Sequence, residues 1–161
     1  MEKSAMIFGA VVIIIIVAAG ALLLFSQKKE TATEGIDPVT YLMSSESGVI
    51  YHIHPEIEIE ILGERQLIPA SIGLENRGMR VIHTHTADGI IHVESPVAQE
   101  FHLKDFFSIW GKTFNSTCIF EYCVDESHTL AFTVNGQPNS EYGNLPLRDK
   151  DKMRIVYSAS S

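Results

Sequence analysis

YHIHPEIEIEIL, residues 51–62, is the stretch of the chain that decides the fold. Its apolar side chains fall on alternate positions, namely Ile53, Ile57, Ile59 and Ile61. Successive side chains of a strand point to opposite faces of a sheet, so the alternation predicts a strand with one apolar face. His52 and His54 then lie on the opposite, polar face together with the glutamates.

Turn signals divide the neighbouring sequence into further short strands. Residues 62–65 are typical of a hairpin turn, and the proline-interrupted strand 66–74 that follows is expected at a sheet edge. Residues 80–85 and 90–94 are predicted to be a strand and its return strand, because Asp88-Gly89 between them favours a tight turn. Two more strands alternate in the same way before Asn135-Gly136 and near the end of the chain.

One stretch outside the amino-terminal region has helical periodicity. Leu103, Phe106, Phe107 and Trp110 recur at the spacing i, i+3, i+4, i+7, and Gly111 follows as a stop signal. We therefore expect a short amphipathic helix whose aromatic face is covered by a sheet. The fold class predicted is α+β: a small, mainly β domain with one short helix, preceded by a transmembrane helix.

The amino-terminal region contains an uncharged apolar run, MIFGAVVIIIIVAAGALLLF, over residues 6–25. Its length suits one helix across a bilayer, and a cleaved signal peptide is the alternative. The predicted organisation is a stub (1–5), the transmembrane helix (6–25), a polar linker (26–47) and a β-rich domain (48–161). The nearly tied flanking lysines do not decide orientation; the signal-anchor layout places the domain outside the cytoplasm. The triplet Asn115-Ser116-Thr117 is a glycosylation acceptor pattern and agrees with export.

Charge and cysteine content narrow the function further. The formal net charge of −8 comes with no basic stripe, which disfavours nucleic-acid binding. Cys118 and Cys123 are close in sequence, and in an oxidising compartment such a pair forms a disulfide. Two free thiols, or a thiolate metal site shared with histidines, are the alternatives. The chain shows no nucleophile motif, phosphate loop or paired-carboxylate signature, so catalysis is not indicated and no catalytic residue is assigned.

Five of the seven histidines lie in two short clusters, and these are the candidate metal ligands: His52, His54, His83, His85 and His92. Two histidines separated by one residue in a strand present both imidazoles on one face, and neutral imidazole binds copper and zinc well. We expect His92 to return through the Asp88-Gly89 turn and face His83 and His85. The alternative is a pair of solvated surface clusters that bind nothing.

Further residues near these clusters are assigned supporting roles. Asp88, Glu58 and Glu94 are candidates to orient the imidazoles by hydrogen bonding. Met79 is either a soft ligand or a packing residue. His102 and His128 stand alone and are expected to be surface or helix-end residues.

The phrases "HIH", "IPASIG", "HTHTADGIIHVESP" and "FHLKDFFSIWGKTF", over about residues 51–114, resemble a family of small, membrane-anchored proteins of archaea and bacteria, largely of unassigned function. Its members carry an acidic residue directly after the second histidine of "HTH", where this chain has Thr86. Residues 90–157 resemble the carboxy-terminal half of ubiquitin-like β-grasp domains, in which a sequence such as "LPLRDKDKMRIVY" introduces the last strand. The carboxy-terminal Gly-Gly of sulfur carriers is absent. A cupin-like barrel, suggested by His52, His54 and Glu58, is a minority alternative because a helix interrupts it.

The sequence thus predicts a membrane-anchored, extracytoplasmic domain that binds copper or zinc and handles the metal, or that serves as an accessory subunit of a membrane complex. Two alternatives are a metal-free protein-interaction module and a small enzyme in which histidines hold a metal with an open position.

Overall fold

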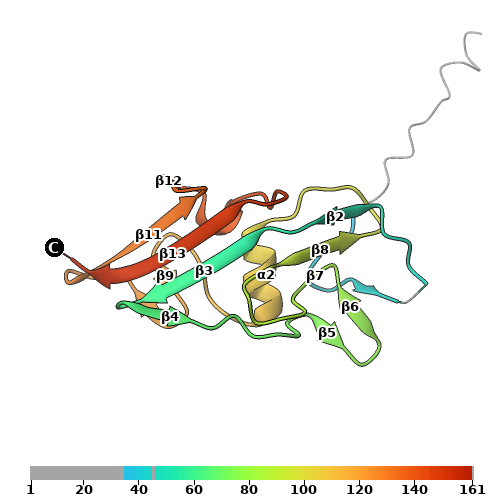
Figure 1. The fold of residues 1–161 in the computed structure, drawn as a ribbon, viewed down its shortest axis with the longest axis horizontal. Coiled ribbons are helices and arrows are strands. Elements are labelled where there is room, and N and C mark those ends of the chain that lie inside the picture. The colour runs from blue at the N-terminus through green and yellow to red at the C-terminus, as the bar shows by residue number, and fades with distance from the viewer. Residues whose placement is uncertain (1–34, 45, 161) are drawn as a thin grey trace, which may run out of the picture. The chain divides into compact units, whose positions relative to one another are not determined.

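A five-stranded sheet is the larger β layer of the computed structural model, which describes residues 35–44 and 46–160 (Figure 1). Its strands lie in the order β12-β11-β13-β3-β4, with the bounds Gln137–Pro138, His128–Val134, Lys152–Ala159, Glu56–Ile61 and Glu64–Gln66. Neighbours are antiparallel except β13 and β3, which are parallel. The alternating apolar residues of β3, β11 and β13 are buried as predicted, including Ile59, Phe132 and Ile155.

Both predicted hairpin turns of this sheet are confirmed. Leu62 and Gly63 join β3 to β4 with φ angles of 51° and 86°, and Asn135 and Gly136 join β11 to β12 with φ angles of 52° and 78°. Two successive left-handed residues match the right-handed twist of the strands they connect. The turn chemistry in the sequence therefore fixes the register of these pairs.

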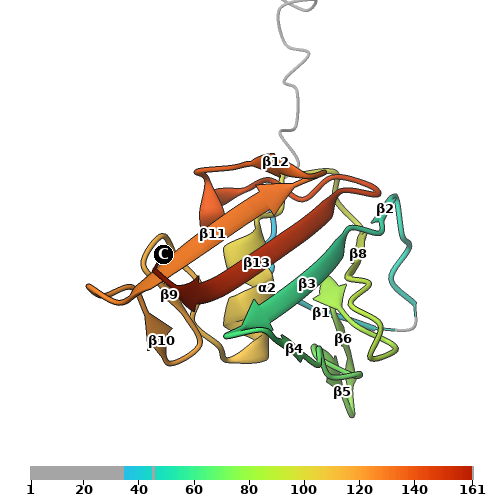
Figure 2. The ribbon, with the colours of Figure 1, turned by 60° about the vertical axis from the view of Figure 1, so that its left-hand side comes forward.

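Within residues 35–44 and 46–160, three smaller sheets accompany the five-stranded one (Figures 1 and 2). A three-stranded antiparallel sheet has the order β2-β8-β7, with the bounds Tyr51–Ile53, His92–Ser95 and Ile82–His83. A second has the order β1-β6-β5, with the bounds Leu42–Met43, Gly78–Arg80 and Leu74–Glu75. The last is the pair β9 and β10, Cys118–Ile119 and Tyr122–Cys123.

The strand predicted across residues 53–61 is broken into two strands that belong to different sheets. β2 ends at Ile53 and β3 begins at Glu56, because Pro55 between them has no N–H to donate to a ladder. The break is held by two hydrogen bonds: His54 N–H donates to Asp149 Oδ1 (2.9 Å), and Lys150 N–H donates to His54 O (3.2 Å). The histidines at 52 and 54 consequently belong with the three-stranded sheet, not with the glutamates of β3.

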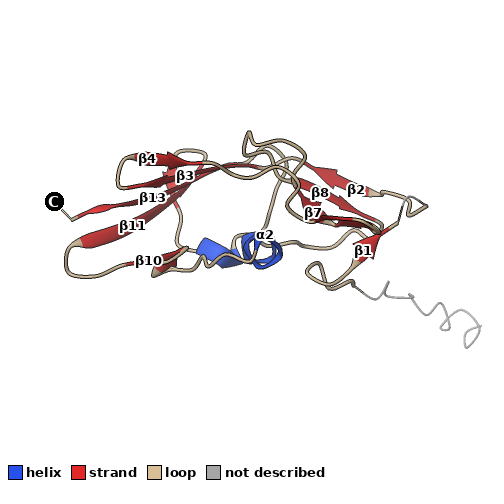
Figure 3. Ribbon diagram, turned by 90° about the horizontal axis from the view of Figure 1, so that it is seen from below, coloured by secondary structure: helices blue, strands red, loops and turns tan. Residues whose placement is uncertain are grey.

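Helix α2, Leu103–Trp110, forms where the periodicity predicts it. Gly111 ends it in the left-handed conformation (φ 71°), and at its start the N–H of His102 donates to Asp105 Oδ2 (2.8 Å). Phe106 and Phe107 are fully buried as predicted. Figure 3 shows α2 on one side of both the five-stranded sheet and the sheet β2-β8-β7. The aromatic face of the helix packs in the hydrophobic core there. A short 3-10 helix, η1 (Tyr142–Asn144), packs near it.

Residues 35–44, where the sequence predicts a linker before a domain that starts at residue 48, belong to the same compact unit as the sheets. Met43 is 1% exposed and lies in β1, which pairs with β6, so the carboxy-terminal part of the predicted linker belongs to the core. Its apolar residues are too sparse to show periodicity, and only pairing with β6 gives them a buried face. The predicted stub and transmembrane helix, residues 1–25, lie outside the described residues. Within the described ranges, no helix combines the length and apolarity needed to span a membrane.

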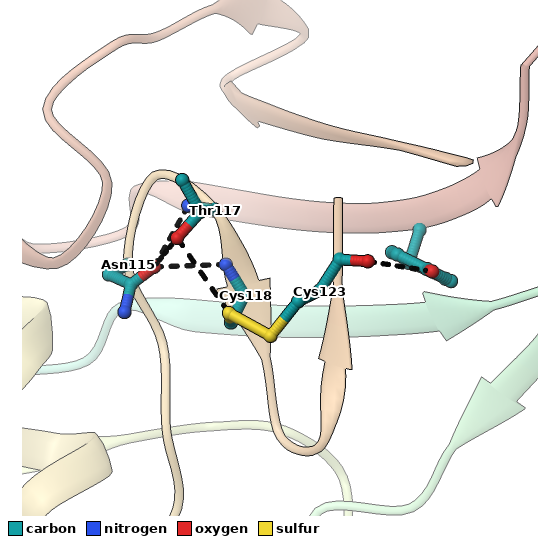
Figure 4. Close-up of a disulfide and its surroundings, with 5 residues drawn as sticks. Asn115, Thr117, Cys118 and Cys123 are labelled. Atoms are coloured by element: carbon teal, nitrogen blue, oxygen red, sulfur yellow. Dashed lines mark hydrogen bonds between the residues drawn. A yellow bond between two sulfur atoms is a disulfide. The ribbon is translucent and has the colours of Figure 1, made fainter. Parts of the chain in front are cut away.

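The predicted disulfide between Cys118 and Cys123 is present and closes the β9–β10 hairpin (Figure 4). The Asn115 side-chain oxygen accepts hydrogen bonds from the Thr117 N–H and hydroxyl (2.8 Å each) and from the Cys118 N–H (2.9 Å). The Tyr157 hydroxyl donates to Cys123 O (3.0 Å), which ties the hairpin to β13. With both sulfurs bonded, a thiolate metal site at these cysteines does not form.

Candidate metal centre

The register of the sheet β2-β8-β7 places all the clustered histidines on one face. Ile53, Val93 and Ile82 are partners across the three strands and are buried against the core. Residues one position away point to the opposite face, so His92 and its β7 partner His83 share that face. β8 is the middle strand, and it carries His92 and Glu94 between the histidines of β2 and those at the end of β7.

Among the described residues, two sets of ligand atoms are compact enough to hold an ion, and they share His92. The first, which we name the β7 group, consists of His83, His85, His92 and Glu94; its ligand atoms all lie within 4.8 Å of one another. The second, the β2 group, consists of His52, His54 and His92 and meets the same limit. The five histidines predicted as ligands are thus all brought into the cluster, but in two overlapping groups and not around one point.

The β7 group contains one pair of ligand atoms at a spacing suited to a metal. His83 Nε2 and His85 Nε2 are 3.2 Å apart. Two nitrogens bound to one tetrahedral ion at about 2.0–2.1 Å from it lie about 3.3 Å from each other. The pair is therefore close to the spacing of a tetrahedral site before any movement of the chain.

His83 is the best-prepared ligand of the cluster. Its residue is 0% exposed, and its Nδ1 lies 2.9 Å from the carbonyl oxygen of Arg80, to which it donates in the tautomer that leaves Nε2 free. Burial lowers the pKa of His83 from 6.5 to about 4, despite the opposing effect of the Arg80 carbonyl. The ring is consequently neutral at physiological pH, the form in which imidazole binds metals.

The loop before β5 holds His83 in this position. Thr84 is fully buried; its hydroxyl donates to Pro69 O (2.8 Å) and accepts from the Ile72 N–H (3.1 Å). Gly73, at φ 73°, approaches so closely that a Cβ there would lie 2.6 Å from Ile82 O. A small residue in the left-handed conformation is needed for the loop to cover His83.

The β2 group is more open. The His52 side chain is 49% exposed, and its Nε2 lies 3.2 Å from Glu94 Oε1. The ring centres of His52 and His54 are 4.5 Å apart, and those of His54 and His92 are 4.6 Å apart. Three imidazoles therefore surround a point next to solvent.

His92 connects the two groups. Its ring centre is 4.6 Å from that of His54 and 4.5 Å from that of His85. Its Nδ1 is buried and has no hydrogen-bond partner among the described residues; the Glu94 carboxylate is 4.0 Å from it. Burial, with the neighbouring His85 and His54 rings, lowers the pKa of His92. A buried ring nitrogen without a partner costs free energy, and a metal ion would supply that partner.

Two of the three residues predicted to orient the imidazoles have other partners. Asp88 accepts from the Thr86 hydroxyl (2.7 Å) and the Ile90 N–H (3.0 Å), and these two bonds lower the pKa of its carboxyl group. It therefore holds the turn that returns the chain to His92. Glu58 lies on β3 and accepts from Arg154 Nε (3.2 Å), away from both groups. Thr86 supports this turn through its hydrogen bond to Asp88.

The remaining predicted residues lie outside the two groups. Met79 is partly buried and packs against the core, although it lines a surface hollow that His85 also borders. His102 sits at the helix N-terminus with Glu100 3.0 Å from its Nε2. His128 pairs with Asp125 at 2.9 Å and stacks on Tyr157. Both histidines therefore have the surface or helix-end positions that the sequence predicts.

Sequence reasoning missed two features of the site. Glu94, expected to orient an imidazole, lies among the ligand atoms of the β7 group; its position two residues after His92 on the same strand was the available signal. The second is the Arg80 carbonyl that orients His83. Every residue has a backbone carbonyl, so the sequence does not indicate which one accepts a hydrogen bond from His83.

Comparison with protein-family models, with curated proteins and with solved structures finds no significant match to this chain.

Proposed function

We propose that this protein is a membrane-anchored, extracytoplasmic domain that binds copper or zinc through its histidine cluster. The observation that carries the proposal is the convergence of five imidazoles and one carboxylate on one face of β2-β8-β7, with buried, neutral His83 aimed at His85. Solvated surface histidines would not need a fully buried, tautomer-fixed member.

The donor set favours transition metals. Imidazole nitrogen suits copper and zinc, and copper binds such sites more tightly where both ions are present. The four donors of the β7 group are the number that a closed tetrahedral zinc site uses. Holding a metal with little free coordination fits storage, delivery or sensing, or an accessory role in a membrane complex, better than it fits catalysis.

The anchor and the compartment are part of the same proposal. Residues 6–25 supply the apolar length of one span, and the Cys118–Cys123 disulfide agrees with an oxidising compartment. The resemblance of residues 51–114 to membrane-anchored proteins points the same way.

We also propose that the five-stranded sheet and α2 form a β-grasp domain. The hairpin β3–β4 comes first, α2 follows, and the last strand, β13, pairs in parallel with β3 in the middle of the sheet. The strands β5 to β8, which carry most of the histidine cluster, are then an insertion between the first hairpin and the helix.

Metal analysis of the full-length protein tests the function. The purified chain, equilibrated separately with Zn²⁺ and Cu²⁺ and then dialysed against metal-free buffer, is expected to retain at least one ion per chain. His83→Ala should weaken retention by well over tenfold, since loss even of outer partners of metal ligands costs 10–100-fold. His102→Ala and His128→Ala are matched controls outside the cluster and should bind as the wild type does.

Two results would contradict the proposal. A wild-type chain that retains no metal would support the metal-free interaction module, in which His83 and His85 simply hydrogen-bond. Equal retention by the wild type and His83→Ala would place any bound metal elsewhere.

A third candidate function is a small metal enzyme. It is favoured by the solvent-facing β2 group, whose three imidazoles leave a fourth coordination position open. Hydrolytic and hydration assays on the metal-loaded protein test it.

A further inference from the structure

The two histidine pairs lie on opposite sides of the strand that carries His92. β2 and β7 each pair with β8, so two strand spacings separate them, which is about 10 Å. In the line across the sheet, His83 is the partner of His92 on one side, and His54 follows β2 on the other. The ring centre of His92 is 5.6 Å from that of His83 and 6.5 Å from that of His52.

One ion cannot bind both pairs in this arrangement. Nitrogens bound to the same zinc or copper ion at about 2.0–2.1 Å lie at most about 4.2 Å apart. Each group of ligand atoms is confined within 4.8 Å, yet among the described residues the two pairs enter separate groups and only His92 enters both. Gathering both pairs around one ion would require the rings to leave the positions that they hold in this structure.

We propose that the cluster binds two metal ions, one in each group, with the His92 imidazole bridging them. This inference rests on the proposed metal binding and adds the number of ions and the role of His92. An imidazole has two nitrogens that point in different directions in the ring plane, so one ring can serve two ions. His92 Nδ1 is buried without a partner beside Glu94, and the ring touches both His54 and His85.

The two positions differ in what they offer an ion. The β7 group has four donors, among them the carboxylate of Glu94 and the fully buried His83. The β2 group has three imidazoles, and the His52 side chain is half exposed. The β7 position therefore binds the first ion and the β2 position binds the second, more weakly and with faster exchange.

Binding of the second ion has a proton balance. The neutral His92 ring carries one N–H, and a ring that binds a metal through each nitrogen has lost that proton to solvent. Filling the second position thus releases one proton from His92, while the lone pair that held it becomes the second metal–nitrogen bond. No oxidation or reduction is involved.

In the first experiment the full-length protein is titrated with Zn²⁺ alone, and binding is measured by isothermal titration calorimetry and elemental analysis. In a parallel experiment the protein is titrated with Cu²⁺, and the bound ions are monitored by electron paramagnetic resonance. Two equivalents of Zn²⁺ are expected, with the second at least tenfold weaker. With two equivalents of Cu²⁺, bridging should couple the spins and reduce the signal below that of two isolated ions.

Variants assign the positions. His52→Ala with His54→Ala changes residues that are not buried and should leave one tight equivalent. His85→Ala, at a residue that is also exposed, should weaken binding of the ion at the β7 position and leave binding at the β2 position. His92→Gln should abolish spin coupling. His128→Ala is the control and should keep two equivalents.

The outcomes separate this inference from the function on which it rests. A wild-type chain that binds one equivalent, lost in parallel in every cluster variant, would overturn the two-ion arrangement and leave metal binding intact. Two equivalents of Cu²⁺ with uncoupled spins would overturn the bridge. Absence of any binding would instead overturn the proposed function itself.

Discussion

Acidification should destabilise the metal-free protein through His83. Burial lowers the pKa of this ring to about 4, whereas an imidazole in the unfolded chain titrates near 6.5. Between these two pKa values, His83 is protonated in the unfolded chain but stays neutral in the folded protein. The contribution of neutral His83 to stability is therefore complete above about pH 6.5 and is lost as the pH falls toward about 4.

The size of the loss follows from the two pKa values. Between about pH 7.5 and about pH 4.5, the difference in proton binding amounts to about 2.5 kcal/mol of unfolding free energy. The solvent-excluded position of His83 justifies using most of the shift, since the residue is 0% exposed. His92, whose pKa is also lowered, changes stability in the same direction.

This effect is measured by urea unfolding of the full-length protein at the two pH values, with a chelator present. Unfolding is monitored by the fluorescence of Trp110. Because carboxylates also titrate, the decisive quantity is the wild-type loss minus the loss in His83→Gln, which has no titrating ring. That difference should be about 2.5 kcal/mol. His102→Gln is the matched control for a histidine-to-glutamine change outside the cluster. If His83→Gln loses as much stability as the wild type on acidification, the reasoning from burial is refuted.

Three further predictions concern the fold and are tested by urea unfolding of substituted proteins at neutral pH. Gly89→Ala should lower stability by about 2 kcal/mol or more, because Gly89 has φ +88° and a Cβ would lie 2.4 Å from Ile57 O; an unchanged midpoint would contradict that contact. Replacing Cys118 and Cys123 together by serine should cost about 2 kcal/mol through the lost loop constraint, and the same loss should appear on reduction of the wild type. Ile155→Ala, in the fully buried centre of β13, should cost about 2–5 kcal/mol, while Leu67→Ala, at a residue 75% exposed, should cost far less.

The local elements were predictable from sequence. Alternation located β3, β11 and β13, and helical spacing located α2, because each pattern depends only on residues a few positions apart. The turn pairs at 62–63 and 135–136 and the cysteine pair were predictable for the same reason. Residues 35–43 were not, since their burial depends on β1 pairing with β6, far along the chain.

The candidate site was predictable in its members but not in its arrangement. The spacing of His52 with His54, and of His83 with His85, placed each pair on one strand face, and the Asp88-Gly89 turn brought His92 back to His83. The prediction that Glu58 orients an imidazole was wrong. Pro55 divides the predicted strand, so Glu58 lies in the five-stranded sheet and contacts Arg154, away from the histidines.

Sequence by itself determined which side chains are apolar, which are imidazoles, and on which face of its own strand each one lies. Only the tertiary structure decided that β8 lies between β2 and β7, that His83 is buried and held by Arg80, and that His92 belongs to both groups. The physical reason is that side-chain direction repeats along a single strand, whereas strand order and burial depend on hydrogen bonds and packing between segments distant in the chain.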